Sequence, residues 1–451
     1  MMKHLKEWLQ RLKSRPASGD HWEDRRHHEA MEALAGCKGE SDWLTLSRHG
    51  NGFVRELAVR ELSELPSPEA LAALLERVND WVPQVRQLAN AGVQRYLTSE
   101  HAPALLHALQ PLMALAERQR ADHSQTLAAA RTVLQGAEVS DSVLTAFLAQ
   151  QGKSARFLFD LLLEASDEPT DLLGKALAHR EMTVRQMAVS ACQSLPAEQA
   201  VPLLQLALAT PGASVRVRAM HALLSKLDDP HEMLPSALLD ASPAVRSLAR
   251  WAAPRWQLDA GEVLAKRLDT ALPKSRREWL GVLGLASELE VSLDERWRAA
   301  ALSSPLSSVR LAALASLGDG HLSEQLAMLD DPADKVFAKA CECLGRQPWD
   351  SLEAELEMRL DSDWQRLSES RRDALMALRP RWQQLAYLLR RLDSDVQQRD
   401  YWLAWIANWC QQQYLMVDPT TAPAERRRLL ARVSELQDSG ALPPGCVTRL
   451  T

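Results

Sequence analysis

The chain has 451 residues, of which 46% are hydrophobic and 25% are charged, and its formal net charge is −6. This length allows two or three ordinary domains or one extended array, and the composition excludes a disordered chain. The near balance of basic and acidic residues argues against a dedicated nucleic-acid binder, which usually carries a strong basic excess.

Residues 1–19 are predicted to form an N-terminal amphipathic helix or cap. Leu5, Trp8, Leu9 and Leu12 fall on one helical face, with lysines and an arginine around them. Such a helix can cap the first repeat, dock in a partner's groove through Trp8, or lie on an anionic membrane through residues 3–13. We expect no secretory signal and no membrane span, because no apolar run approaches the roughly 20 residues that a span requires.

Residues 20–415 repeat a valine–arginine step about every thirty residues. Alanine follows four residues after each valine, and a further small or apolar residue, including one cysteine, follows at eight, so the three share one helical stripe. Val336, Ala340 and Leu344 fit the same pattern, with Phe337 in the arginine position, and weaker copies start at 26, 125, 155, 275 and 370. The step itself occurs at Val54-Arg55, Val85-Arg86, Val184-Arg185, Val215-Arg216, Val245-Arg246 and Val309-Arg310.

A second amphipathic stretch precedes each of these helices, and turn signals such as Asp229-Pro230 and Ser304-Pro305 separate the elements. A helical pattern with a period near thirty is typical of a solenoid. We therefore predict an all-α fold, an α-solenoid or superhelix of about twelve helical hairpins with a long concave surface. The stretch 98–140 fits worst and is expected to contain a longer loop or a bend.

The repeats resemble HEAT repeats, and more closely the short bacterial type shared with bilin lyases. The signature D-x-x-P-x-V-R-x-x-A stands here as DWVPQVRQLA at 80–89 and as DASPAVRSLA at 240–249. The resemblance implies a structural arginine whose head pairs with an acidic residue or carbonyl of an adjacent unit. The residues assigned to these contacts between repeats are Arg55, Arg86, Arg185, Arg216, Arg246, Arg310, Asp80 and Asp240.

The first repeat contains a histidine pair, His27 and His28, followed by Glu29. HHEAMEAL resembles the H-E-A-x-x-A-L helix of deoxyhypusine hydroxylase, a HEAT-type di-iron enzyme. Iron needs several histidine or carboxylate ligands from facing units, and the matching positions of the later repeats do not supply them. The histidines are therefore interpreted as surface residues, with an adventitious metal site including His21 as the alternative.

A second resemblance is to HEAT-like alkylpurine DNA glycosylases, which use aromatic and acidic residues on a concave basic face. Trp251, Trp256, Trp279 and Trp297 are candidates by residue type. Tryptophans at repeat boundaries more often pack in the core, and the net negative charge weakens DNA binding. Base excision is kept as an alternative function.

The stretch YWLAWIANWCQQQY at 401–414 places Trp402, Trp405 and Trp409 along one helical face. The face either packs on the preceding repeat as a cap or anchors a partner, since exposed tryptophan is favoured at binding hot spots. Residues 416–451 are predicted to comprise a linker, a final helix (ERRRLLARVSELQ) and a loose tail.

The six cysteines form no C-x-x-C pair and are expected to be reduced thiols in a cytoplasmic protein. Searches for nucleophile, phosphate-binding and zinc motifs are empty, and no cofactor or metal is assigned. We predict a bacterial-type, non-enzymatic scaffold or adaptor that binds a protein partner on its concave surface. The alternatives are a DNA-glycosylase-like protein and, more remotely, a bilin-lyase-like or metal-dependent enzyme.

Overall fold

The computed structural model describes residues 21–35, 37, 39–411 and 420–447, together with Glu7 and Gln10. Over these residues it is helical and contains no β-strand. The chain divides into two compact units, Met1–Pro230 and His231–Thr451, called here the first and second units. Within the part of the chain that is described, no helix is both long enough and apolar enough to cross a membrane.

The helices of the first unit are mostly 6 to 14 residues long, with short 3₁₀ turns η1 (Ser99–His101), η2 (Leu115–Glu117) and η3 (Ala137–Val139) between some of them. They are α2 (His21–Leu34), α3 (Glu40–Leu46), α4 (Gly52–Glu64), α5 (Pro68–Arg77), α6 (Pro83–Gln94), α7 (Ala102–His107), α8 (Leu109–Ala114), α9 (Ser124–Leu134), α10 (Ser140–Ala149), α11 (Gly152–Glu164), α12 (Thr170–Leu177), α13 (Met182–Cys192), α14 (Ala197–Ala209) and α15 (Ala213–Lys226).

The second unit continues the alternation of shorter and longer helices, with 3₁₀ turns η4 (Ala253–Trp256), η5 (Met328–Asp330) and η6 (Val396–Gln398). Its helices are α16 (Leu234–Leu238), α17 (Pro243–Ala252), α18 (Ala260–Leu268), α19 (Arg276–Glu288), α20 (Glu295–Leu302), α21 (Ser307–Ala315), α22 (Leu322–Ala327), α23 (Asp334–Leu344), α24 (Trp349–Asp363), α25 (Glu369–Ala377), α26 (Arg381–Ser394), α27 (Arg399–Gln411) and α28 (Pro423–Asp438).

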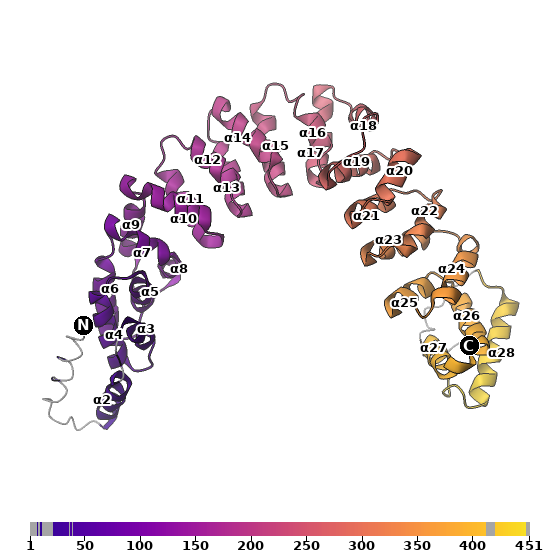
Figure 1. Cartoon of the computed structure of the whole chain (residues 1–451), viewed down its shortest axis with the longest axis horizontal. Coiled ribbons are helices and arrows are strands. Elements are labelled where there is room, and N and C mark those ends of the chain that lie inside the picture. The colour runs from indigo at the N-terminus through magenta and orange to yellow at the C-terminus, as the bar shows by residue number, and fades with distance from the viewer. Residues whose placement is uncertain are drawn as a thin grey trace. The chain divides into compact units, whose positions relative to one another are not determined.

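Each unit is built from antiparallel hairpins whose helices pack on neighbours in chain order. In the first unit α5 packs on α6, while α4 packs on α6 and α3 on α5. In the second unit, Figure 1 shows α19, α21, α23 and α25 following one another along one side, with α18, α20, α22 and α24 along the other. Packing between successive hairpins is the defining property of a solenoid, so the prediction of an all-α solenoid is confirmed.

The predicted stripe forms the core of these hairpins. Val54, Ala58 and Leu62 of α4 are completely buried, and the same three positions are completely buried in α6, α13, α15 and α23. Each of the twelve predicted start positions lies within a helix or caps one. The alanine at the centre of the stripe lets the next helix approach closely in these repeats, whereas α11 and α19 bury the larger Phe159 and Trp279 at the same position.

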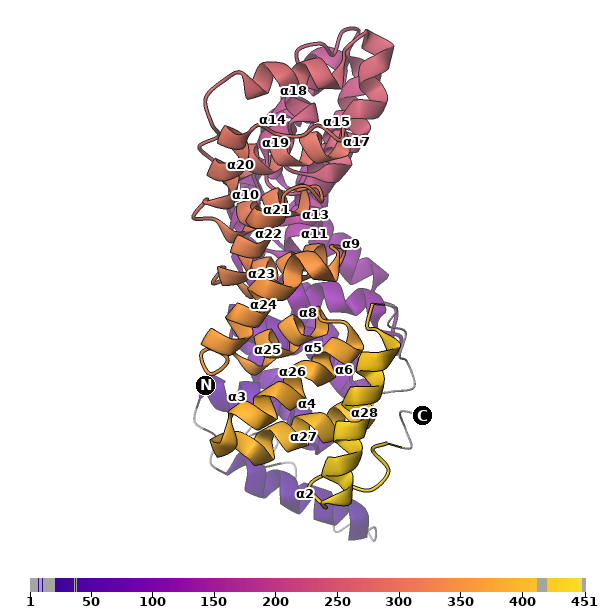
Figure 2. The same cartoon turned by 90° about the vertical axis from the view of Figure 1, so that its right-hand side faces the viewer.

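Two regions depart from the regular pattern. Between α6 and α9 the first helix of the hairpin is broken into α7 and α8, which accounts for the long interval at 98–140. After the last hairpin, α28 lies against α26, as Figure 2 also shows. The segment after α28 differs from the expected loose tail, because Leu442 and Cys446 are buried and Val447 N–H donates to Gln437 Oε1.

The arginine of the repeat closes the loop of its own hairpin. In all six valine–arginine helices, Nη1 donates to the backbone carbonyl oxygen of the residue six positions earlier, at 2.5–3.2 Å. Because these carbonyls lie in the turn between the two helices, the arginine supplies the partner that a buried loop carbonyl needs. The arginine–carbonyl pairs are Arg55 with His49, Arg86 with Asp80, Arg185 with His179, Arg216 with Thr210, Arg246 with Asp240, and Arg310 with Ser304.

In five of these six turns, the residue that offers the carbonyl also caps the turn with its side chain, and Asp331 does the same before α23; in the turn before α15, the Thr210 hydroxyl donates instead to the Ala207 carbonyl. Asp80 Oδ1 accepts from Val82 N–H at 2.9 Å, and His179 Nδ1 accepts from Glu181 N–H at 3.0 Å. His49, Asp240, Ser304 and Asp331 accept in the same way from the amide two residues on. We call these residues loop anchors; the term covers His49, Asp80, His179, Asp240, Ser304 and Asp331.

Two aspartate loop anchors, Asp80 and Asp331, also receive an arginine from the preceding hairpin. Arg55 of α4 binds the carboxylate of Asp80 through Nε and Nη2 at 2.8 and 2.9 Å, and Arg310 of α21 binds Asp331 in the same bidentate manner. Such paired charge-assisted bonds are strong and directional. The pairs therefore fix neighbouring hairpins in register, whereas the hydrogen bonds of Arg86 and Arg185 fall within their own hairpins.

Arg246 shows a different arrangement in the second unit. Its Nη2 lies 2.6 Å from Glu288 Oε1 at the end of α19, while Asp240 receives Arg277 at 2.8 Å. Gly284 makes the space, because an added Cβ would lie 2.3 Å from Arg246 Cζ. Two ion pairs therefore join the hairpin of α17 to the hairpin of α19. In one pair the arginine belongs to α17, and in the other it belongs to α19.

Candidate functional site

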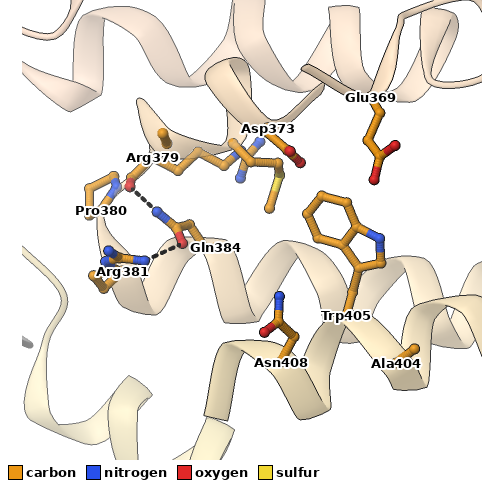
Figure 3. A pocket seen from close by; sticks show the side chains of 11 residues that line it. Glu369, Asp373, Arg379, Pro380, Arg381, Gln384, Ala404, Trp405 and Asn408 are labelled. Carbon is orange, nitrogen blue, oxygen red and sulfur yellow. Dashed lines mark hydrogen bonds between the residues drawn. The ribbon is translucent and has the colours of Figure 1, made fainter. Parts of the chain in front are cut away.

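An open pocket of about 790 Å³ lies in the second unit, where α25, α26 and α27 meet. Figure 3 shows carboxylates and an indole ring at one end and amide and guanidinium groups at the other. The pocket is lined by Glu369, Asp373, Met376, Ala377, Arg379, Pro380, Arg381, Gln384, Ala404, Trp405 and Asn408. We call Glu369, Asp373 and Trp405 its acidic end, and Arg381, Gln384 and Asn408 its amide end.

Local sequence fixes the orientation of α25. The Ser368 hydroxyl caps the helix by accepting from Arg371 N–H, and Glu369 occupies the first turn, where the helix dipole favours a negative charge. Leu375 and Met376 are buried, so the helix is held by its apolar side. Glu369 and Asp373, four residues apart, therefore point together into the pocket (Figure 3).

Glu369 and Asp373 have no ion-pair or hydrogen-bond partner among the described side chains, unlike most carboxylates around them. Nearby acids do have partners, as in the pairs Arg371–Asp334, Arg379–Glu357 and Arg390–Asp361. Burial, and then the negative charge of Glu369, raises the pKa of Asp373 above its ordinary value, while Arg372 opposes this rise. Two like charges one helical turn apart repel each other, so a cation placed between them would be bound favourably.

Trp405 forms the wall opposite these carboxylates and rests on a rigid aromatic cluster. Its ring lies 5.6 Å from that of Trp364 and 6.2 Å from that of Tyr401, while Trp364 is itself buried against Trp402. The half-buried indole thus has one side supported and another turned toward the pocket (Figure 3). An indole face beside carboxylates attracts cations through both charge and the ring quadrupole.

Residues in and beside the turn between α25 and α26 hold the side chain of Gln384 at the amide end in place. Gln384 is buried, and its Nε2 donates to the Arg379 carbonyl at 2.9 Å, while Arg381 Nη1 donates to Gln384 Oε1 at 3.5 Å. The Arg379 guanidinium is paired with Glu357 and lies over the Tyr387 ring, and burial lowers its pKa. Asn408 remains exposed at the mouth with an amide that can both donate and accept.

The tryptophans predicted to bind a partner are only partly placed at this site. Trp402 and Trp409 are core residues, at 0% and 5% exposure, so neither can anchor a partner as we had allowed. Trp405 reaches the pocket because its position is rotated about 60° from that of Trp402 and about 40° from that of Trp409 around the helix axis. Trp8 lies outside the described residues.

The tryptophans considered for DNA binding likewise include both buried and exposed residues, and the histidine pair contacts neighbouring side chains. Trp279 and Trp297 stack edge to face at 5.5 Å inside the core and cannot hold a DNA base, whereas Trp251 is exposed beneath Arg255. His27 stacks on Phe53, and His28 pairs with Glu32. No group of three or more histidine, cysteine or acidic side chains in the described ranges could hold a metal ion.

Comparison with known proteins identifies no family for this chain. No protein-family model and no curated protein matches the chain. Among solved structures, the chain is similar to an engineered protein at 14% identity, covering 88% of this chain and 98% of that one, with a TM-score of 0.23. It is also similar to a chain in a structure of Kap95p bound to RanGDP, at 10% identity and a TM-score of 0.32, covering 99% of this chain and 66% of that one. The helical-repeat solenoid therefore rests on the packing of the helices themselves.

Proposed function

We propose that the protein is an interaction scaffold or adaptor whose second unit binds a basic segment of a protein partner in the pocket between α25, α26 and α27. The observation that carries this proposal is the pair of unpartnered carboxylates, Glu369 and Asp373, facing the indole of Trp405. A lysine or arginine side chain entering the acidic end would meet both charges and the ring face. The polar amide end would accept the main chain of the same segment through Asn408.

The surroundings favour a peptide over a nucleic acid. Phosphate groups would be repelled by Glu369 and Asp373, whereas a basic side chain would remove the repulsion between these two residues. Six free thiols support the further proposal of a reducing, cytoplasmic compartment. The pocket is pre-formed by three packed helices, which limits the ordering that binding requires.

The test measures binding of a fluorescein-labelled hexalysine peptide to the full chain by fluorescence anisotropy at low salt. We expect E369Q/D373N to weaken binding by about tenfold, equivalent to 1.4 kcal/mol, and W405L to weaken it less. The matched control is E295Q/D350N, which removes two carboxylates from the first turns of α20 and α24. Equal losses in the control and in E369Q/D373N would refute the pocket as the binding site.

The same variants then test the scaffold role with whole proteins. A partner recovered with the wild-type chain should be lost with E369Q/D373N and kept with E295Q/D350N. Recovery that is unaffected by E369Q/D373N would place partner binding elsewhere on the chain. Retardation of duplex DNA by the wild-type chain at low salt, with no hexalysine binding, would favour the nucleic-acid alternative instead.

A further inference from the structure

A second depression, of about 630 Å³, lies in the first unit between the end of α13 and the outward face of α15. We call it the basic groove, and its lining includes Gln193, Val217, Arg218, His221, Ser225 and Lys226. No acidic side chain lines it. It shares no residue with the pocket of the second unit.

The periodicity of α15 explains why most of these residues share one face. Val215, Ala219 and Leu223 form the completely buried stripe. Arg218, His221 and Ser225 follow the spacing i, i+3, i+7 on another face of the helix and are exposed. Lys226 is the last residue of α15 and is half-buried in angular register with the buried stripe, and its long side chain reaches the groove from there.

The groove offers hydrogen-bond donors that are not used within the described structure. Arg218 and His221 have no hydrogen-bond or ion-pair partner among the described residues and are exposed. Lys226 Nζ donates to the Leu195 carbonyl at 2.8 Å, which holds the side chain across the groove and leaves two of its three N–H bonds for a ligand. A surface that combines donors, positive charge and an apolar residue, Val217, suits a carboxylate-bearing chain.

We infer that the basic groove binds an extended acidic segment of a protein partner, with two carboxylates about four residues apart. Arg218 and Lys226 are eight residues apart on one helix, a rise of about 12 Å. An extended peptide advances about 3.3 Å per residue, so carboxylates four positions apart match this separation. His221 and Gln193 lie between or beside these charges and can hydrogen-bond the peptide main chain.

A nucleic acid fits the groove less well than an acidic peptide. Backbone binding to a nucleic acid uses a basic surface that follows many phosphates. The α13 residues in register with Arg218 and His221, Met187 and Ser190, are uncharged, and Ser190 donates to the Gln186 carbonyl. The positive charge is therefore confined to α15 in this part of the first unit, as a short segment requires.

The test uses two labelled twelve-residue peptides of equal composition and the full chain at low ionic strength. One peptide carries glutamate at every fourth position among glycines, and the other carries the same glutamates in one block. Fluorescence anisotropy should show the spaced peptide binding about fivefold more tightly than the blocked one. R218Q/K226Q should remove this preference and weaken binding about tenfold, while R118Q/K153Q, which removes two exposed charges elsewhere in the first unit, should change it less than about twofold.

Lys226 also holds a backbone carbonyl, so S225E provides a second variant that leaves this bond intact. It places a carboxylate at the groove and should weaken the spaced peptide while the circular dichroism spectrum and melting curve stay unchanged. Equal binding of both peptides, or no effect of S225E and R218Q/K226Q in folded protein, would overturn the inference. Tighter binding of a twelve-nucleotide oligo-dT that R218Q/K226Q abolishes would overturn it in favour of a nucleic acid. Hexalysine binding should be untouched by these variants, which keeps this test separate from that of the proposed function.

Discussion

Asp80 in the first unit and Asp373 in the second are the same residue type in opposite environments. Asp80 is buried among Arg55, Arg77 and the Val82 amide, and although burial opposes ionisation, these hydrogen bonds and positive charges hold its pKa below the ordinary value. Asp373 faces Glu369 at an open pocket, and its pKa is raised. The comparison separates a carboxylate that holds hairpins together from one that is left for a ligand to satisfy.

The largest expected effect comes from D80N. The amide keeps the shape of the loop but leaves Arg55 buried without its counter-ion, which costs about 3–5 kcal/mol. Hydrogen exchange of α4 to α6 under mild denaturant should report this loss locally. D171N is the control, because Asp171 forms an exposed pair with Lys175 and its loss should cost less than about 1 kcal/mol. Similar exchange in both variants would show that the Arg55–Asp80 pair does not set the stability of these hairpins.

A smaller effect is expected for R185M, which tests how much the pairing of a repeat arginine with a carboxylate of the next hairpin contributes. Arg185 donates to the carbonyls of His179 and Arg180, so its removal orphans backbone acceptors but strands no carboxylate. The expected cost is about 1–3 kcal/mol. R55M should cost more than R185M in the same urea unfolding experiment, since it leaves Asp80 charged and buried. A larger loss of stability in R185M than in R55M would show that the buried Asp80 carboxylate does not dominate the contribution of Arg55.

As the pH falls, protonation of Asp80 should lower the stability of the fold, whereas protonation of Asp373 should raise it. The lowered pKa of Asp80 means that its contribution is fully present above the unfolded value of 3.8 and is lost as the pH falls through the folded value. The raised pKa of Asp373 means that protonation below its folded value favours the native state. Melting temperature measured against pH should therefore fall less steeply in D80N than in wild type, and more steeply in D373N. Parallel curves for all three proteins would contradict this assignment.

The smallest effect on folding is expected for D373N. Removing a charge that repels Glu369 should change stability by less than about 0.5 kcal/mol, and in the stabilising direction. Hexalysine binding should nevertheless weaken, and its decline as the pH falls through the raised pKa of Asp373 should become shallower in the variant. Anisotropy titrations at several pH values provide the measurement. A variant that is destabilised, or that keeps the wild-type pH profile of binding, would place Asp373 with the structural carboxylates.

Sequence periodicity was sufficient to predict the helices and their buried stripe. Residues spaced like Val54, Ala58 and Leu62 recur along the chain, and only a helix brings this spacing to one face. The signature D-x-x-P-x-V-R-x-x-A marked Asp80 and Asp240, five positions before the valine, but it did not mark the loop anchors that are not aspartate. His49, His179 and Ser304 occupy the same position in their repeats. The spacing could not reveal that Arg246 would pair with Glu288, 42 residues later, because Gly284 creates that contact.

The pocket itself was beyond sequence reasoning. Trp405 lies 36 residues after Glu369, on another helix, and nothing in the local pattern shows that their helices converge. The three tryptophans of α27 share a broad stripe, and the rotation between Trp402 and Trp405 determines which one is buried. Packing against α25 and α26 decides that choice, and packing depends on the whole unit.

Closure of each loop by the hairpin's own arginine has a consequence for how such arrays change length. When the arginine of a hairpin bonds the loop carbonyl of the same hairpin, that backbone group needs no hydrogen-bond partner from a neighbouring hairpin. Duplicating the segment from Ala197 to Lys226 would copy the Arg216–Thr210 contact intact, and excising it would remove both partners together, so that only the junctions between hairpins would have to be rebuilt. Growth or shortening by whole modules is therefore the kind of variation that this architecture accommodates most readily.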